Sequence, residues 1–410
     1  RALVAEWLAH GTSSNAVAAR TDVTARRLLS FLAHADLVLE TAQARTYDLY
    51  ARQIARDADH LLSEWRSLDD EGRVVALSAV AQAGLACDNG AVMHARAEAA
   101  LLSELDRQIL SDGGHLSRDP RVIPALLLDL IPLRQLYGVA HRTAPRLLVD
   151  TIGRMIEFAS VLRLGDGQLT HLSGRRTDHD IALPPLTLLG TPPQRWYGAA
   201  SGFARVAEGP TVLIVDAGAD HSSAGALSFE WSAGPVPVVM SAGDTSVLRL
   251  GSRSHGRPAG STLRRATQST LMIDAPTAAP RADAPPQPTL AQRQGIDIVT
   301  VPGSGTRIDS THAGPGARGF AHRRVIEVVE RGLKIIGQDT LRPLVGPPAE
   351  RPAALAFHFQ LHPDVAVEIE DDRASVRLTL RDGTLWRFGV TAGRISVEDN
   401  VTVLNGRAIP

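Results

Sequence analysis

The feature that most constrains this chain is a change in hydrophobic periodicity near residue 165. Before it, apolar residues recur at helical spacing in segment after segment, as in TDVTARRLLSFLA and GRVVALSAVAQAGLA. After it, short β-branched runs such as TVLIVDA, ALSFEWS and VPVVM alternate, and Gly, Pro, Asp and Asn separate them. A run of helices followed by a run of strands favours an α+β chain with separate domains over a parallel α/β sheet.

The length of 410 residues also exceeds what one ordinary core organises, so we expect several domains. Residues 1–163 are predicted to form a helical domain of six or so amphipathic helices, stacked as antiparallel hairpins in a layer or ring. Residues 164–198 are expected to be a polar connector, and residues 199–410 a large antiparallel β-sandwich. Within the sandwich, the Pro-rich stretch 275–289 is expected to be a long surface loop.

Composition excludes several functional classes. A formal net charge of −1 and the lack of a basic stripe argue against a nucleic-acid partner. We find no uninterrupted apolar run of membrane-spanning length and therefore expect no membrane span. Cys87 is the only cysteine, which excludes an intrachain disulfide framework. The abrupt start at Arg1, inside a helical pattern, indicates a fragment whose compartment signal is not visible.

The basic residues are almost all arginine, with Lys334 as the single lysine among 43. One explanation is a GC-rich genome. The other is functional, because guanidinium forks pair well with carboxylate and sulfate groups of acidic ligands. The sequence leaves both explanations open.

Five motifs follow one another along the chain: QILSDGGHLSRDP (108–120), HSSAGALSFE (221–230), QSTLMID (268–274), AHRRVIEV (321–328) and FHFQLHPDV (357–365). In this order, on a helical-then-β background, the chain resembles the heparinase II/III-like family of polysaccharide lyases, most closely its α-proteobacterial branch. It lacks the N-terminal segment that such proteins usually carry. The resemblance implies an incomplete α/α toroid joined to an antiparallel β-sandwich, with a glycan cleft between them. It also implies a carbon–oxygen lyase that acts by β-elimination on a uronate-containing bacterial polysaccharide.

β-Elimination at a uronate sets three chemical tasks. The C5 carboxylate must be neutralised, a base must take the C5 proton, and an acid must protonate the departing O4. By resemblance, an Asn-His pair and a Tyr in an E-R-S-x-x-Y-H pattern would do this. The preceding turn is present as 112–115 and Arg118 fits the pattern, but Val122 and Ile123 stand where Tyr and His are expected. Gly72-Arg73 stands at the position of the Asn-His pair.

The resemblance further implies a structural metal in the sandwich, held by two His-containing stretches and a V-D-x-G turn. Of these ligands only His221 is present, while Ser223, Gly225 and Gln268 replace the others, and 239–243 lacks the carboxylate. One histidine cannot hold a zinc ion, which needs three or four ligands. We therefore expect neither a metal nor another cofactor.

The candidate site residues are His115 and His221 as catalytic bases, and Arg73, Arg118, Arg205 and Arg323 as ligands of an acidic sugar. Each has a structural alternative, such as a turn residue for His115 or a polar loop residue at a sheet edge for His221. Strand alternation places Arg323 on the face opposite to His322 and Arg324. Glu230 is expected to be a satisfied sheet charge, and the histidines of 357–365 to be structural.

Three functions are compatible with these observations. The leading hypothesis is a metal-independent lyase in which His115 or His221 acts as base and Arg118 or Arg73 neutralises the carboxylate. The second is a non-catalytic protein of the periplasm or cell envelope that binds an acidic polysaccharide on the same scaffold. The third is a helical scaffold protein with an unrelated β-module. The sequence leaves the sugar, the linkage and the oligomeric state open.

Overall fold

The structure is a computed structural model, and it describes residues 2–10, 16–172, 191–218, 226–241, 269–273, 295–301, 305–312, 320–343, 355–398, 402–404 and 407–409. The chain divides into two compact units. The first comprises Arg1–Leu116 and Val122–Ile156, and the second Ser117–Arg121 and Glu157–Pro410. The short segment Ser117–Arg121 therefore belongs to the second unit, although it lies between two helices of the first.

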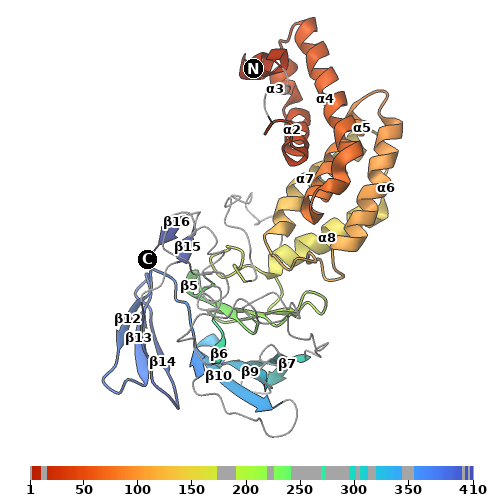
Figure 1. Ribbon diagram of the computed structural model, residues 1–410. Coiled ribbons are helices and arrows are strands. Elements are labelled where there is room, and N and C mark those ends of the chain that lie inside the picture. The colour runs from red at the N-terminus through yellow and green to blue at the C-terminus, as the bar shows by residue number, and fades with distance from the viewer. Residues whose placement is uncertain are drawn as a thin grey trace, which may run out of the picture. The chain divides into compact units, whose positions relative to one another are not determined.

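The first unit is helical and is coloured red to yellow in Figure 1. Its helices are α1 (Ala2–His10), α2 (Thr21–Ala33), α3 (Ala35–Leu39), α4 (Ala44–Glu64), the 3-10 turn η1 (Trp65–Ser67), α5 (Asp70–Ala86), α6 (Ala91–Gln108), α7 (Val122–Val139) and the first part of α8 (Arg146–Val161).

Helix α5 is the core of this unit and packs against α2, α4, α6 and α7. Every residue from Val74 to Gly84 is buried, and apart from Ser78 and Gln82 this stretch consists of small or branched apolar residues with no polar face. Its start is capped by the Asp69 carboxylate, which accepts from the Gly72 backbone N–H at 2.8 Å. At Gly84 a side chain would collide with the His94 backbone, so this glycine permits the close approach of α5 and α6.

Helix α7 is the one described helix long and apolar enough to cross a membrane, by length and composition alone. The helix contains no uninterrupted apolar run of membrane-spanning length, because polar residues such as Asp129 and Arg134 interrupt its sequence. More than half of the helix is buried among the other helices of its unit. Pro132 lies inside it, and Gln82 of α5 donates to the nearby Asp129 carbonyl at 3.0 Å. These contacts are those of an interior helix in a packed bundle.

The second unit is built from antiparallel sheets. The first sheet has the order β1-β2-β3-β4-β5, with β1 (Arg195–Tyr197), β2 (Phe203–Glu208), β3 (Thr211–Asp216), β4 (Phe229–Ala233) and β5 (Val236–Val239). The second has the order β10-β9-β8-β7, with β7 (Gly295–Val301), β8 (Gly305–His312), β9 (Phe320–Val329) and β10 (Lys334–Pro343). The third contains β12 (Ala366–Ile369), β13 (Ser375–Thr379) and β14 (Leu385–Gly389), and two-strand pairs join β11 (Leu355–Phe357) to β6 (Leu271–Ile273) and β15 (Thr402–Leu404) to β16 (Arg407–Ile409).

One apolar cluster joins these sheets into a sandwich. Ala204 and Val206 of β2 lie in it together with Ile326 of β9 and Leu378 of β13. Trp231 of β4 meets Trp386 of β14 in the same cluster, with ring centroids 4.7 Å apart. Inner faces of separate sheets thus share one core, which is the packing of a β-sandwich.

The opposite face of the first sheet is covered as well. Side chains alternate along β2, so Phe203 and Arg205 point away from the sandwich core. Phe158, from the end of α8 that belongs to the second unit, packs edge-on against Phe203 and Trp196. This covered face holds the side chains that matter below.

The predicted order of a helical part followed by antiparallel sheets is confirmed. Strand β1 lies inside the segment expected to be a connector, and it pairs with β2. The Pro-rich stretch 275–289 lies outside the described residues.

Candidate functional site

The turn formed by residues 112–115 is a tight structure within the first unit. Gly113 has φ +88°, and a side chain there would overlap the Arg154 carbonyl, so the position requires glycine. Asp112 accepts from the Gly114 N–H at 3.2 Å. His115 is buried, and its Nε2 lies 3.0 Å from Oε1 of Gln108. The ring is therefore held at the end of α6, whatever further role it has.

Arg118 lies in the second unit and is 8% exposed. Its Nε donates to the Ser201 carbonyl at 2.7 Å, and its Nη2 donates to the Asp216 carboxylate in a very short ion pair. The guanidinium carbon lies 5.1 Å from the centre of the Phe203 ring. Nη1 is buried without a partner among the described residues, but Asp216 balances the charge.

Gly218 belongs to the same arrangement. A side chain at this position would overlap the Arg118 guanidinium, so the glycine leaves the room that the arginine occupies. The Gly218 N–H also donates to Asp216 Oδ1 at 3.1 Å. The local sequence Asp-Ala-Gly at the end of β3 thus forms a receptor for Arg118.

The two positions where the resemblance leads us to expect Tyr and His are apolar and buried. Val122 is 5% exposed and Ile123 is 0% exposed at the start of α7. Upstream, Arg73 donates to the carbonyls of Leu68 (2.9 Å) and Arg66 (3.2 Å), beside the turn that precedes α5. Arg73 therefore stabilises a helix junction inside the first unit.

Arg323 lies on β9, and the predicted alternation is confirmed. Its Nε donates to Asp309 at 2.7 Å, and its Nη2 makes a second, very short contact to the same carboxylate. The hydrogen bond from Arg323 holds the pKa of Asp309 below its usual range. Burial acts in the opposite direction, and Arg307 lowers the pKa further. On the other face, Arg324 and His322 bind Asp339, at 2.7 and 2.6 Å.

Glu230 on β4 is a satisfied sheet charge, as expected. It is 0% exposed and accepts from Thr170 Oγ1 (2.7 Å), the His171 N–H (3.0 Å) and the Ser241 N–H (2.7 Å). In the 357–365 motif, the His362 N–H donates to the Val238 carbonyl at 3.0 Å, which links this segment to the edge strand β5.

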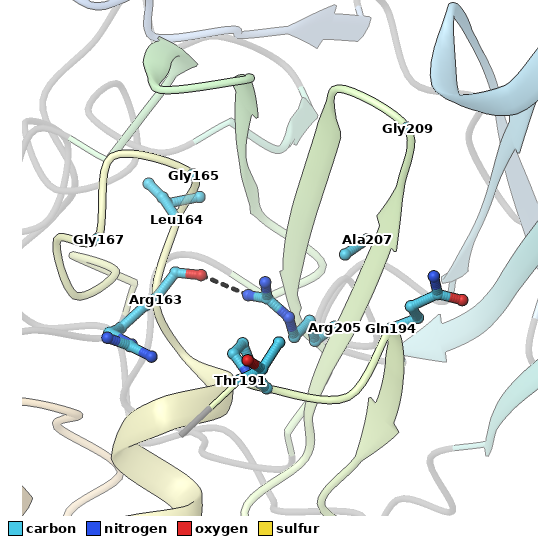
Figure 2. A pocket seen from close by; sticks show the side chains of 10 residues that line it. Arg163, Leu164, Gly165, Gly167, Thr191, Gln194, Arg205, Ala207 and Gly209 are labelled. Carbon is cyan, nitrogen blue, oxygen red and sulfur yellow. Dashed lines mark hydrogen bonds between the residues drawn. The ribbon is translucent and has the colours of Figure 1, made fainter. Parts of the chain in front are cut away.

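A pocket of about 420 Å³ opens beside Arg205 on the outer face of the first sheet (Figure 2). Its lining consists of Arg163, Leu164, Gly165, Gly167, Thr191, Pro192, Gln194, Arg205, Ala207 and Gly209. All of these belong to the second unit. Of them, only Arg205 was a candidate from the sequence, because the others lie at the end of the predicted helical domain, in the expected connector or in the β2–β3 hairpin, and belong to no motif.

Arg205 is 4% exposed, and its Nη1 donates to the carbonyls of Val161 and Arg163. Figure 2 shows the bond to Arg163 as a dashed line. The Nε atom is buried and has no hydrogen-bond partner among the described residues. Burial, and then the neighbouring Arg163 charge, lower the pKa of Arg205 to about 10. The group is therefore still a cation at neutral pH.

The structure brings two of the six candidates to one sheet face. Arg118 and Arg205 lie on the outer face of the first sheet, on either side of Phe203. Arg73 and His115 lie in the helical unit, and Arg323 lies on the second sheet. His221 and Gln268 are outside the described residues. Within the described part of the chain, no group of three His, Cys, Asp or Glu residues could hold a metal, and the absence of a metal stays a prediction.

Comparisons with known proteins agree with this fold. Residues 190–410, more than half of the chain, match the family model "Heparinase II/III-like, C-terminal". The heparan sulfate lyase HepC of Pedobacter heparinus, solved as a mutant, superposes with a TM-score of 0.70 at 15% identity, over 99% of this chain and 68% of that one. Heparinase III, the BT4657 gene product, superposes with a TM-score of 0.71 at 16% identity, over 95% of this chain and 64% of that one.

A curated relative is the FtsZ-localized protein C of Caulobacter vibrioides. It is 27% identical over 362 residues, which is 83% of this chain and 61% of the relative. The chain thus spans less than two thirds of that protein's length. The structural matches identify the helical part with the toroid of the lyases and the sheets with their β-sandwich. With its C-terminal half matched by the family model, the chain belongs to the heparinase II/III-like family.

Proposed function

We propose that this protein is a non-catalytic member of the family that binds an acidic polysaccharide in the periplasm or cell envelope. The observation that carries the proposal is the combination of a lyase-like fold with buried valine and isoleucine at the expected acid–base positions. Neither Val122 nor Ile123 has a proton to transfer. General acid–base catalysis contributes about 10²- to 10⁴-fold in rate per positioned group, so its loss abolishes useful turnover.

Arg118 supports the same proposal. A lyase needs a cation to neutralise the C5 carboxylate, and this arginine already neutralises Asp216. Removing one partner of a buried ion pair costs about 3–5 kcal/mol, so a substrate carboxylate would have to offset that cost before it gained anything. Arg118 therefore acts here as an internal cross-link between residues 117–121 and the end of β3.

Acidic polysaccharide is the ligand that the scaffold favours. Several similar structures are named as heparan sulfate lyases or heparinases, and the ligands in those names are acidic glycans. The curated relative is named for its localisation with FtsZ rather than for a reaction, which supports a role without catalysis. That relative also supports the α-proteobacterial branch.

β-Elimination is the second candidate, and family membership is the observation that favours it. His221 would be the base in this case. Arg73 and Arg118 donate to protein groups in this structure, so one of them would have to exchange its partner for the substrate carboxylate.

One pair of measurements separates the two functions. Binding to a panel of uronate polymers is measured by calorimetry, and turnover by the ultraviolet absorbance of the unsaturated uronate product. We expect binding without absorbance change at high protein concentration, for the wild type and for His221→Ala alike. Turnover that His221→Ala abolishes while the circular dichroism spectrum is unchanged would overturn the non-catalytic proposal. Polymer binding to neither protein would overturn both functions.

A further inference from the structure

We infer that the pocket lined by Arg163 and Arg205 is a binding site for one anionic substituent of a sugar, a carboxylate or a sulfate. The inference deepens the proposed function, since it rests on an acidic glycan as ligand and assigns where one of its charges is held. It differs from the polysaccharide cleft that the family resemblance implies, because every described lining residue belongs to the sandwich unit.

Arg205 is a buried cation, and no carboxylate among the described residues forms an ion pair with it. Its side-chain hydrogen bonds to described residues leave from one nitrogen, Nη1, and both go to backbone carbonyls. These carbonyls, of Val161 and Arg163, lie at the C-terminal end of α8, where the helix dipole supplies roughly half a negative charge. That partial charge fixes the guanidinium but does not neutralise it. Buried charges in proteins are normally paired, so a full counter-charge is missing here.

Arg205 also has an unused hydrogen-bond donor. Nε of Arg205 is buried and has no partner among the described residues, while the side chain itself lines the pocket (Figure 2). A guanidinium presents its donors as a planar fork that matches two oxygens of a carboxylate or sulfate. An anion in the pocket would therefore meet the charge and provide acceptors for the donors that the α8 carbonyls leave unused.

Arg163 adds a second cation to the same pocket. Its side chain is only partly buried, whereas its backbone carbonyl accepts from Arg205. The two guanidinium groups repel one another, and this repulsion helps to lower the pKa of Arg205. Both positive charges would attract an anion bound in the pocket, and that anion would reduce the repulsion between them.

The rest of the lining suits a sugar ring. Gly165, Gly167, Ala207 and Gly209 contribute almost no side-chain volume, and the space of about 420 Å³ lies within the range typical of small-ligand pockets. Gln194 and Thr191 offer an amide and a hydroxyl group, which can bond to sugar hydroxyls. The described lining contains no Asp or Glu. A second pocket, lined by residues 368–372 and Arg377, carries four carboxylates, so it is expected to repel the same anion.

The test uses the full chain and three small probes: D-glucuronate, glucose 6-sulfate and uncharged D-glucose. Calorimetric titration at low, matched ionic strength is expected to show binding of at least one charged sugar and none of glucose. Which of the two binds distinguishes a carboxylate site from a sulfate site.

Two pocket variants make the inference falsifiable without touching the buried Arg205. Arg163→Gln removes the exposed cation and is expected to weaken binding about tenfold or more, the loss of one charge-assisted hydrogen bond. Ala207→Glu, on the same strand face as Arg205, places a carboxylate in the pocket and is expected to abolish binding while keeping or raising the melting temperature. Arg377→Gln, an exposed arginine on β13, is the matched control and should bind like the wild type.

Wild-type affinity in both pocket variants would overturn the inference, as would the lack of binding of either charged sugar. The outcome for the proposed function is read separately, from binding of the intact uronate polymer. Polymer binding that survives Ala207→Glu would refute this site and leave the proposed function standing. Binding of the small probes without polymer binding would support this site and refute the proposed function.

Discussion

Substitution of Asp216 by asparagine tests whether Arg118 is a locked structural cross-link or a cation available to a ligand. Asparagine keeps the shape of the side chain and an oxygen for the Gly218 N–H, but it removes the negative charge. Arg118, which is 8% exposed, would keep the amide oxygen, the Ser201 carbonyl and the Phe203 ring as partners, but it would have no negative charge to pair with. Leaving one member of a buried ion pair uncompensated costs about 3–5 kcal/mol. We expect the free energy of unfolding of the second unit to fall by that amount.

The assay must report on the two units separately, since a chain with two units need not unfold in one step. Hydrogen exchange followed by mass spectrometry in increasing urea provides this. Peptides from β2 and β3 report on the second unit, and peptides from α5 report on the first. We expect the urea midpoint of the β2 and β3 peptides to shift and that of the α5 peptides to stay unchanged.

The double variant Arg118→Met/Asp216→Asn is the control for the charge. Methionine removes the buried cation and retains apolar volume beside Phe203, so the double variant should be more stable than Asp216→Asn alone. A loss below about 1 kcal/mol in Asp216→Asn would be typical of a solvated surface pair and would refute the reasoning. Arg118 would then be available to neutralise a substrate carboxylate, as β-elimination requires.

Three further predictions concern other positions. Burial raises the pKa of Asp129 to about 6, against the opposing effect of Arg26, so this group destabilises the fold as pH rises from about 4 to 6. In Asp129→Asn the free energy of unfolding at pH 7 should rise by up to about 3 kcal/mol, with a higher melting temperature, and the pH profile should be flatter below pH 6; identical profiles would contradict this. Gly113→Ala should lower stability by at least about 2 kcal/mol in thermal melts, because φ is positive and the side chain would meet the Arg154 carbonyl. Arg324→Met should cost up to about 3 kcal/mol, since it leaves the partly buried Asp339 carboxylate with His322 alone, and an unchanged urea midpoint would refute it.

What the sequence could predict follows from local periodicity. Alternation placed Arg323 on the face opposite to Arg324, and the structure has their carboxylate partners on different strands. Glu230 was expected to be satisfied, and it is, although its donors Thr170 and His171 could not be named. Each of these correct predictions needs only the two-residue repeat of a strand.

What the sequence could not predict depends on contacts between distant segments. Asp216 is 98 positions from Arg118, and no spacing rule links an arginine after a turn to the end of a strand that far away. Arg163 lies at the end of the predicted helical domain, Gln194 lies in the expected connector, and β1 is too short for an alternating pattern. The pocket exists because this connector returns to the sheet, where the Gly165 N–H donates to Ser232 Oγ at 2.8 Å.

Under the proposed function, Arg118 and Arg205 have different roles. Both cations lie on one face of one sheet, beside the same phenylalanine, and both are almost fully buried. Asp216 neutralises the first, whereas the hydrogen-bond partners of the second among the described residues are two backbone carbonyls, with Arg163 as a neighbouring charge. A catalytic cation must strengthen its contact as charge develops in the transition state, next to groups that move protons. A binding cation needs only a stable charge and an open approach. Arg205 meets the requirements of a binding cation. The described lining of its pocket contains no Asp, Glu, His, Cys or Tyr that could move a proton beside it.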